Sequence, residues 1–335
     1  MTMRRLLLAV SLLAFSLPAA AAQTFKIATL APDGSSWMND MRAAAEEIGK
    51  RTDNRVQFRF YPGGVMGNDQ SVLRKIRIGQ LHGAAFTAGS LAEVYPDINV
   101  LGLPFLFRNL DEVDYLRSQL DPVLRKGLED AGFVNFGFAE GGFAKVMSTR
   151  PIRKTTDLNN EKAWVPDNDK ISYRVMSALG VSPVRMPITD VLTGLQTGLI
   201  SVVGSSPLGA IAFQWHTRIK YMTDEPLIYL VGLFVIDKRA FDKLSEADRK
   251  VVREVMEATY ARLDKANRED NARAHQALQQ QGVEFVKAEP DAIRQWRATA
   301  ERVNRELAKE GMFSEEITDR AYRLLEEYRS GKAAQ

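Results

Sequence analysis

The chain has 335 residues, of which 45% are hydrophobic and 26% charged, and it contains no cysteine. These values are ordinary for a globular protein of about two domains, and the missing cysteine excludes disulfides, thiol catalysis and thiolate metal sites. The formal net charge of +3 falls to +1 without Arg4 and Arg5, which is too small to indicate binding to nucleic acid or to an anionic membrane.

The N-terminus has the pattern of a secretory signal peptide, assigned to residues 1–22. Arg4 and Arg5 precede the almost uninterrupted apolar run 6–17, and four alanines end the segment. The apolar run is shorter than the roughly 20 residues that span a bilayer. We expect cleavage near Ala22, export to the periplasm and a soluble mature chain; a buried N-terminal helix fits the paired arginines less well.

Strands and helices alternate from the start of the mature chain. Alternating apolar and polar residues predict strands at 24–30, 55–60 and 83–87. Helical patterns fill the two intervals, at 37–52 and 70–79, with Ser35 or Ser36 as the cap of the first helix. This order is typical of an α/β domain with a mainly parallel sheet.

The same rhythm returns further along the chain. Apolar runs predict strands at 133–138, 161–165, 184–186, 200–204 and 227–236. Helices are expected to begin at Asp111, to occupy 171–179, and to run from Thr189 to Gly198. A capping box at Ser245 begins a helix whose pattern continues toward Gly282, a length of roughly 35 residues or 50 Å. The sequence therefore predicts two α/β domains bridged by long elements.

None of the usual catalytic signatures is present. His82, His216 and His275 have no ligand spacing, and the glycine-rich segment 61–67 lacks the Lys-Ser/Thr of a phosphate-binding loop. No serine-hydrolase motif occurs. We expect no enzyme activity, no cofactor and no metal site, and we expect 61–67 to be a turn with two or three residues at positive φ.

The predicted strands end in residues that suit binding. In open α/β sheets ligands bind at the carboxyl ends of strands, and a crevice between two domains can close by hinge motion. The residues at these ends are small, hydroxylic or aromatic. They occupy 30–37, 86–89, 140–145, 164–168 and 204–207.

Five segments, in this order, carry a resemblance to a known family: YPGGVMGNDQSVLRKIRIGQLHGA (61–84), LPFLFRN (103–109), DLNNEKAWVP (157–166), ALGVSPVRMPITDVLTGLQTGLI (178–200) and FDKLSEADRKVV (241–252). The chain resembles the solute-binding proteins of tripartite ATP-independent periplasmic (TRAP) transporters, of the DctP type. The resemblance implies a two-domain α/β periplasmic binding protein, type II-like, with hinge strands and one long domain-spanning helix. It places domain I at 23–143 plus about 231–270, and domain II at 144–230 plus about 271–331.

Two departures from the family pattern concern the ligand. The family usually has an arginine, which binds the ligand's carboxylate, where this chain has Trp164, and its Asp-Gly-Gln-Glu-Asn-Pro stretch is replaced by 201–207. An indole offers one N–H donor and a large apolar face. We therefore predict Trp164 as a pocket wall for a less acidic, apolar, aromatic or cationic ligand. The alternatives are core packing of Trp164, and a counter-charge supplied by Lys145 or Arg185.

The remaining candidates each have a structural alternative. Trp37 either stacks on the ligand or staples its helix, Glu140 is a ligand contact or a surface carboxylate, and Trp215 lines the crevice or packs in its own domain. Arg185 is either a counter-charge for the ligand or an ordinary exposed arginine, and among the candidates this surface alternative is strongest for Arg185. The other residues expected to face the crevice are Phe86, Thr87, Gly89, Ser205 and Ser206.

The sequence thus predicts a monomeric extracytoplasmic receptor that closes around a small molecule and delivers it to TRAP permease subunits, with no nucleic-acid partner. Ligand contacts from both domains would favour the closed state. A sensory receptor of the same fold is an alternative, and a periplasmic enzyme is disfavoured by the missing catalytic signatures.

Overall fold

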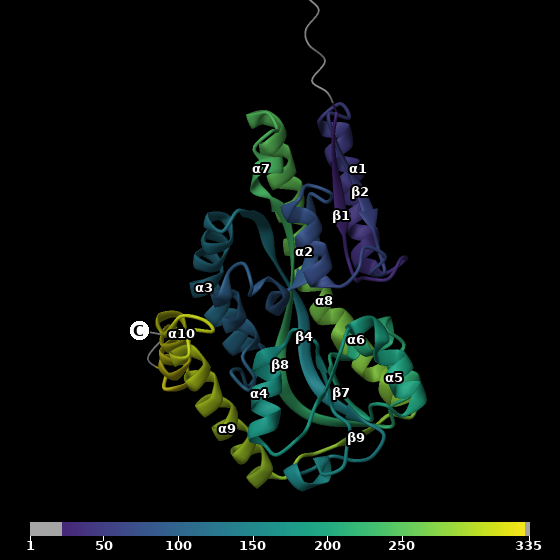
Figure 1. Cartoon of the computed structure of the whole chain (residues 1–335), viewed down its shortest axis with the longest axis vertical. Helices are drawn as coiled ribbons and strands as arrows, with labels where there is room; N and C mark the ends of the chain where they lie inside the picture. The colour runs from purple at the N-terminus through teal and green to yellow at the C-terminus, as the bar shows by residue number, and fades with distance from the viewer. Residues whose placement is uncertain (1–21, 332–335) are drawn as a thin grey trace, which may run out of the picture.

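The structure is a computed structural model, and it describes residues 22–331. The predicted signal peptide therefore lies outside the described residues, except for Ala22. Between residues 22 and 331, no helix combines the length and the apolar composition needed to cross a membrane. Figure 1 shows an upper and a lower part, joined by long strands and a long helix.

Seven strands form one mixed sheet, in the order β2–β1–β3–β8–β4–β7 with β9 beside β8. β1 pairs in parallel with β2 and β3, whereas β8 pairs antiparallel with β3 and β4, and β7 pairs antiparallel with β4. The expected parallel pairing is therefore found in β1–β3 and again between β8 and β9, whereas the pairs β3–β8, β8–β4 and β4–β7 are antiparallel. The strand bounds are β1 (Gln23–Ala28), β2 (Val56–Tyr61), β3 (Gly83–Thr87), β4 (Phe133–Ser148), β7 (Val202–Ser205), β8 (Tyr221–Asp237) and β9 (Glu284–Val286).

The two long strands, β4 and β8, have 16 and 17 residues and pass from the upper to the lower part (Figure 1). Both are longer than predicted. Their pairing shifts register three times, between Asn135 and Phe138, between Glu140 and Gly142, and again after Ala144. Such bulges break the alternation of side chains while the strand continues, and Gly142 takes the positive φ of 82° that one of them requires. The alternation of apolar and polar residues in the sequence of β4 therefore ends before β4 itself does.

A separate pair of parallel strands, β5 (Trp164–Pro166) and β6 (Val184–Met186), lies in the lower part. Ser35 caps α1 by accepting a hydrogen bond from the Met38 backbone N–H at 3.3 Å. The helices are α1 (Ser36–Arg51), α2 (Asp69–Arg77), α3 (Leu110–Asp130), α4 (Lys170–Ala178), α5 (Val191–Thr197), α6 (Pro207–Ala212), α7 (Lys238–Phe241), α8 (Glu246–Gln280), α9 (Pro290–Lys309) and α10 (Glu315–Arg329).

Helix α8 has 35 residues, as the sequence predicts, and Ser245 caps it by accepting from the Asp248 N–H at 3.1 Å. In Figure 1 the helix begins beside α1 in the upper part and reaches α6 in the lower part. It also packs along β4. Together with β4 and β8, it gives three connections between the two parts.

The C-terminal helices pack against elements from both parts of the chain. Residues 271–331 are predicted in domain II, and the second half of α9 and α10 share a hydrophobic core with α3, β3 and the 3-10 helix Pro96–Gly102, as well as with Ile171 and Val175 of α4. Leu307 and Leu325, for example, are fully buried there beside Leu116. The sequence offered no separate pattern for these helices, because their apolar stripe faces elements about 200 residues earlier.

A buried ion pair fastens α10 to α3. The Glu112 carboxylate accepts hydrogen bonds from the Arg329 guanidinium at 2.7 and 2.8 Å and from the Arg108 N–H at 2.9 Å. Burial alone would raise the pKa of Glu112, but these donors hold the pKa below its ordinary value. The contribution to stability is therefore fully present above the unfolded-state pKa, near 4.5, and is lost as the pH falls through the lower folded-state pKa.

We expect the Glu112→Gln variant to lose less stability than the wild type between about pH 5 and pH 3, because only the wild type has this carboxylate to protonate. Urea-unfolding midpoints across that range measure the difference. The exposed Glu284→Gln variant is the control and should follow the wild type. Parallel pH profiles for Glu112→Gln and the wild type would contradict the assignment.

Candidate functional site

Segments that follow the carboxyl ends of β2, β5 and β6 approach one another in the structure. We call β1–β3 with α1 and α2 lobe I (residues 23–91), and β5–β7 with α4–α6 lobe II (residues 164–212). The loop 61–68, which follows β2, is the contact between them. Its Asn68 side chain lies 3.4 Å from the Asp167 carboxylate, and a Cβ built at Gly64 would lie 3.2 Å from the Thr189 methyl group.

The loop is built on glycine, as predicted. Gly63, Gly64 and Gly67 have φ values of 66°, 75° and 98°, which favour glycine. Asn68 then caps α2 by accepting from the Ser71 N–H at 3.1 Å. Of the three glycines, only Gly64 lies next to lobe II, where a Cβ would crowd the Thr189 methyl group.

A series of hydrogen-bonded polar side chains lies at the end of β3, next to this loop. Thr87 is exposed and its hydroxyl lies 2.9 Å from the Ser90 hydroxyl, which in turn bonds the Asp69 carboxylate. Burial raises the pKa of Asp69; the Ser90 hydrogen bond opposes that rise, and the negative charge of Asp167 adds to it. Sequence reasoning found Thr87 and the exposed Gly89 but missed Asp69, because an aspartate at a helix start has an ordinary structural explanation.

Trp164 is buried in the structure. It is 7% exposed, its indole N–H donates to the Met186 carbonyl at 2.9 Å, and its ring meets the Trp215 ring edge-on at 5.3 Å. Both tryptophans belong to the core of lobe II, with Trp215 only 2% exposed. The indole donor is therefore already used, and the geometry favours the core-packing alternative that the sequence left open.

Three further candidates are also buried. Phe86 lies in the core that contains α3. The Ser206 hydroxyl caps α6 by accepting from the Gly209 N–H at 3.2 Å, and the Ser205 hydroxyl donates to the Ser206 carbonyl at 3.1 Å. These serines build the turn at the end of β7, and neither hydroxyl is free in this conformation.

Glu140 and Lys145, both on β4, have charged partners within the protein. The Glu140 carboxylate is 1% exposed and binds the Arg268 guanidinium of α8 at 2.8 and 3.0 Å, so the surface alternative for Glu140 is wrong. Burial raises the pKa of Glu140, and Arg268 opposes that rise. Lys145 pairs with Asp224 on β8. Neither contact was visible in the sequence, because the partners lie 79 to 128 residues away.

Arg185 differs from the other charged candidates. Its guanidinium stacks on the Tyr173 ring at 3.7 Å, and within residues 22–331 it makes no ion pair or hydrogen bond. Burial raises the pKa of Asp169, the cap of α4, and the positive charge of the nearby Arg185 opposes that rise. Arg185 is exposed, as the surface alternative requires, and its five donors remain available.

Trp37 occupies an intermediate position. It is partly buried at the first turn of α1 and packs against the hydrophobic core that contains Phe25 and Phe234. This packing agrees with the alternative in which Trp37 anchors the start of α1 to the core. The exposed part of its ring leaves room for another contact. Among residues 22–331, no group of three or more possible metal ligands is found.

Comparisons with known proteins agree on one family. The sequence model for bacterial extracellular solute-binding protein family 7, DctP, matches residues 27–310. The 2,3-diketo-L-gulonate-binding periplasmic protein YiaO of Escherichia coli K12 is 26% identical over 283 residues, covering 82% of this chain and 84% of that protein. The C4-dicarboxylate-binding periplasmic protein DctP of Rhodobacter capsulatus is 24% identical over 274 residues, covering 80% and 81%.

A solved structure shares the fold. The sugar acid binding protein DctPAm from Advenella mimigardefordensis, in complex with galactonate, aligns with a TM-score of 0.83 and 20% identity, covering 92% of this chain and 99% of that chain. The alignment therefore includes the two lobes, the long strands and α8.

Proposed function

The chain belongs to family 7 of the bacterial extracellular solute-binding proteins, the receptors of TRAP transporters, and we propose that it captures a small organic acid in the cleft between lobes I and II. The family is periplasmic, its members bind solutes and are not enzymes, and they work with membrane permease subunits. The observation that supports the proposal is the approach of the loop 61–68 to Asp167 and Thr189, which follow the carboxyl ends of β5 and β6.

The ligand class follows from the relatives and from Arg185. The relatives described above bind 2,3-diketo-L-gulonate, a C4-dicarboxylate and galactonate, all of which carry a carboxylate. A buried carboxylate needs a charged or hydrogen-bonding partner. Trp164 has no donor left and Lys145 is already paired with Asp224. We assign the counter-charge to Arg185, whose planar guanidinium can hold a carboxylate with two hydrogen bonds.

Closure follows from contacts on both sides of the cleft. A ligand held by Arg185 in lobe II and by Thr87 or the Gly89 backbone in lobe I binds the closed form better than the open form, and only such a difference in affinity shifts the equilibrium. We place the hinge in β4, β8 and α8. The two domains proposed from the sequence are retained, with α10 moved from domain II to domain I.

A cationic ligand is the second candidate. Burial raises the pKa of Asp69 and the nearby Asp167 charge adds to that rise, and this pair of carboxylates would attract a positive charge. An aromatic ligand stacked on Trp164 fits less well, because that ring is enclosed by the core of lobe II.

Native mass spectrometry of the purified mature protein, followed by denaturing extraction, tests the ligand class. We expect a co-purified carboxylate, bound by Arg185→Gln at least about tenfold more weakly than by the wild type, the loss typical of a charge-assisted hydrogen bond. Calorimetry measures the affinity. Arg218→Gln, at another exposed arginine of the lower part, is the matched control. Equal affinities of the two variants would contradict the role of Arg185, and a co-purified amine would favour the cationic alternative.

A further inference from the structure

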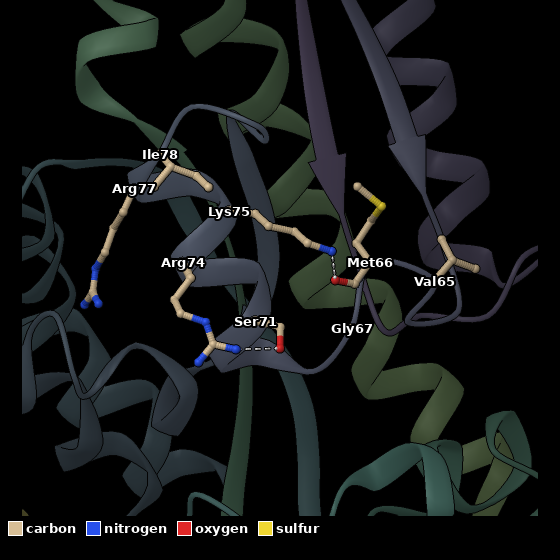
Figure 2. A pocket seen from close by; sticks show the side chains of 8 residues that line it. All are labelled: Val65, Met66, Gly67, Ser71, Arg74, Lys75, Arg77 and Ile78. Carbon is tan, nitrogen blue, oxygen red and sulfur yellow. Dashed lines mark hydrogen bonds between the residues drawn. The ribbon is translucent and has the colours of Figure 1, made fainter.

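A hollow of about 700 Å³ lies on the outer side of lobe I, beside the loop that contacts lobe II. Figure 2 shows its two walls: Val65 and Met66 of the loop form one, and α2 from Ser71 to Ile78 forms the other. The strand ends that form the ligand cleft do not line it.

The hollow carries exposed apolar side chains at two ends. Val65 is 70% exposed and Ile78 is 68% exposed, and within residues 22–331 these are the most exposed large apolar side chains, ahead of Leu199 at 52% and Val123 at 38%. Figure 2 shows Val65 and Ile78 on opposite sides of the hollow. Isolated exposed apolar residues need no explanation, but a concave surface bounded by two of them is typical of a protein-protein contact.

Three cations line the hollow, and in Figure 2 Lys75 extends from α2 toward the loop, whereas Arg77 points away from it. The Lys75 ammonium donates to the Met66 carbonyl at 2.7 Å, and the Arg74 guanidinium donates to the Ser71 hydroxyl at 3.1 Å. Arg77 pairs with Glu93 at 2.9 Å. Neither Arg74 nor Lys75 has a carboxylate partner among the described residues, so the hollow has a net positive charge.

The position of the loop connects this surface to the state of the cleft. The wall formed by Val65 and Met66 belongs to the same loop as Gly64, which lies close to Thr189, and Asn68, whose side chain donates to the Asp167 carboxylate at 3.4 Å. Movement of lobe II changes these contacts. A partner bound in the hollow therefore touches a loop whose contacts with lobe II differ between the open and the closed receptor.

We propose that this hollow is a docking surface for an acidic, apolar-tipped peptide segment on the extracytoplasmic side of the permease; the inference rests on the proposed receptor function. Carboxylates of the segment pair with Arg74 and Lys75, and an apolar side chain lies between Val65 and Ile78. Charge complementarity of this kind fixes orientation and speeds association. Because the loop wall is supported by lobe II, the closed receptor presents the complete surface.

A lipid surface is a poorer partner. Recognition of anionic headgroups typically uses clusters of about four to eight basic residues, whereas only Arg74 and Lys75 lack a carboxylate partner here. The concave shape admits a protruding side chain more readily than a flat membrane. Binding to a lipid membrane is therefore one of the results that the test below can detect.

The test measures binding of the loaded mature receptor to its permease reconstituted in liposomes. Ile78→Glu and Arg74→Glu each introduce a negative charge into the hollow, and we expect each to raise the half-saturating receptor concentration at least about tenfold. Val123→Glu on α3 and Arg323→Glu on α10 introduce the same charges at other exposed positions and should remain within about twofold of the wild type. Urea midpoints and ligand occupancy by native mass spectrometry show that each variant is folded and loaded.

Three results would overturn the inference, and they are distinguishable. Hollow variants that bind the permease as well as their controls would show that another surface docks. Binding of the wild type to phosphatidylglycerol vesicles without permease, lost in Ile78→Glu, would make the surface a membrane contact. A wild-type receptor that binds its ligand but never the permease would overturn the transport role together with this surface.

Discussion

Replacing Arg117 with methionine lowers the free energy of unfolding by about 3–5 kcal/mol, the cost of leaving buried charges without their partner. The guanidinium lies on α3 beneath the hinge strands and has about 10% of its side chain exposed. It donates to Asp121, to both oxygens of Asp264, to the Tyr229 hydroxyl and to the Phe138 carbonyl, at 2.8 to 3.2 Å. No other side chain of the described residues joins as many elements.

The size of this effect follows from what remains after the substitution. Burial alone would lower the pKa of Arg117, but Tyr229, Asp121 and Asp264 hold it far above its ordinary value. Burial raises the pKa of Asp121, and one oxygen of that carboxylate has no hydrogen-bond partner even with Arg117 present. Without the guanidinium, two carboxylates face each other at low dielectric. The Glu140 backbone N–H, which donates to Asp264 at 2.7 Å, is the remaining support.

Urea unfolding of Arg117→Met, compared with Lys126→Met on the same helix, measures this difference. Lys126 is 75% exposed and pairs with Asp130 in solvent, so its removal should cost at most about 1 kcal/mol. If the two variants unfold at the same urea concentration, the network does not stabilise the hinge. An Arg117→Met/Asp264→Asn double variant that regains part of the loss would support the charge explanation.

Replacing Trp164 with alanine should lower the free energy of unfolding by about 3–5 kcal/mol, the typical range for removing a large aromatic side chain from a core. The cavity would open beside Trp215, and the Met186 carbonyl would lose its donor. Trp164→Phe keeps an aromatic ring in the core but removes the N–H and part of the ring volume, so we expect a smaller loss of about 1–3 kcal/mol.

Ligand affinity of the folded Trp164 variants separates the two roles of this residue. Core packing predicts that Trp164→Phe binds the co-purified ligand within a few-fold of the wild type, despite its lower urea midpoint. A pocket wall predicts the reverse, with binding lost and the midpoint little changed. Binding lost from a stable Trp164→Phe protein would restore the aromatic or cationic ligand class.

Much of the fold could be predicted from local pattern. The Ser245 cap follows from the capping box and the length of α8 from its helical pattern, and the positive φ values at Gly63 and Gly64 follow from residue type. The full length of β4 could not be predicted, because bulges near Glu140 interrupt the alternation on which strand prediction depends.

The site was less predictable, because its side chains are placed by distant contacts. β5 has only three residues, too few for periodicity to show which face is buried. In the parallel pairing, Trp164 lies opposite Val184 and Val165 opposite Arg185. Successive residues of a strand point to opposite faces, so Trp164 and Arg185 lie on different sides of this small sheet. The register of β5 and β6 therefore explains why Trp164 is in the core and Arg185 is exposed.

The position of β8 inside the sheet has a consequence for biosynthesis. β3 is complete at residue 87, but its neighbour in the sheet is the segment Gly232–Ile236, nearly 150 residues later in the chain. Until that segment has been synthesised, β3 has an unpaired edge, which is a site for aggregation. Pairings at such separation also slow folding. In a nascent chain of this protein, that edge of β3 therefore lacks its partner until residues 232–236 have been made.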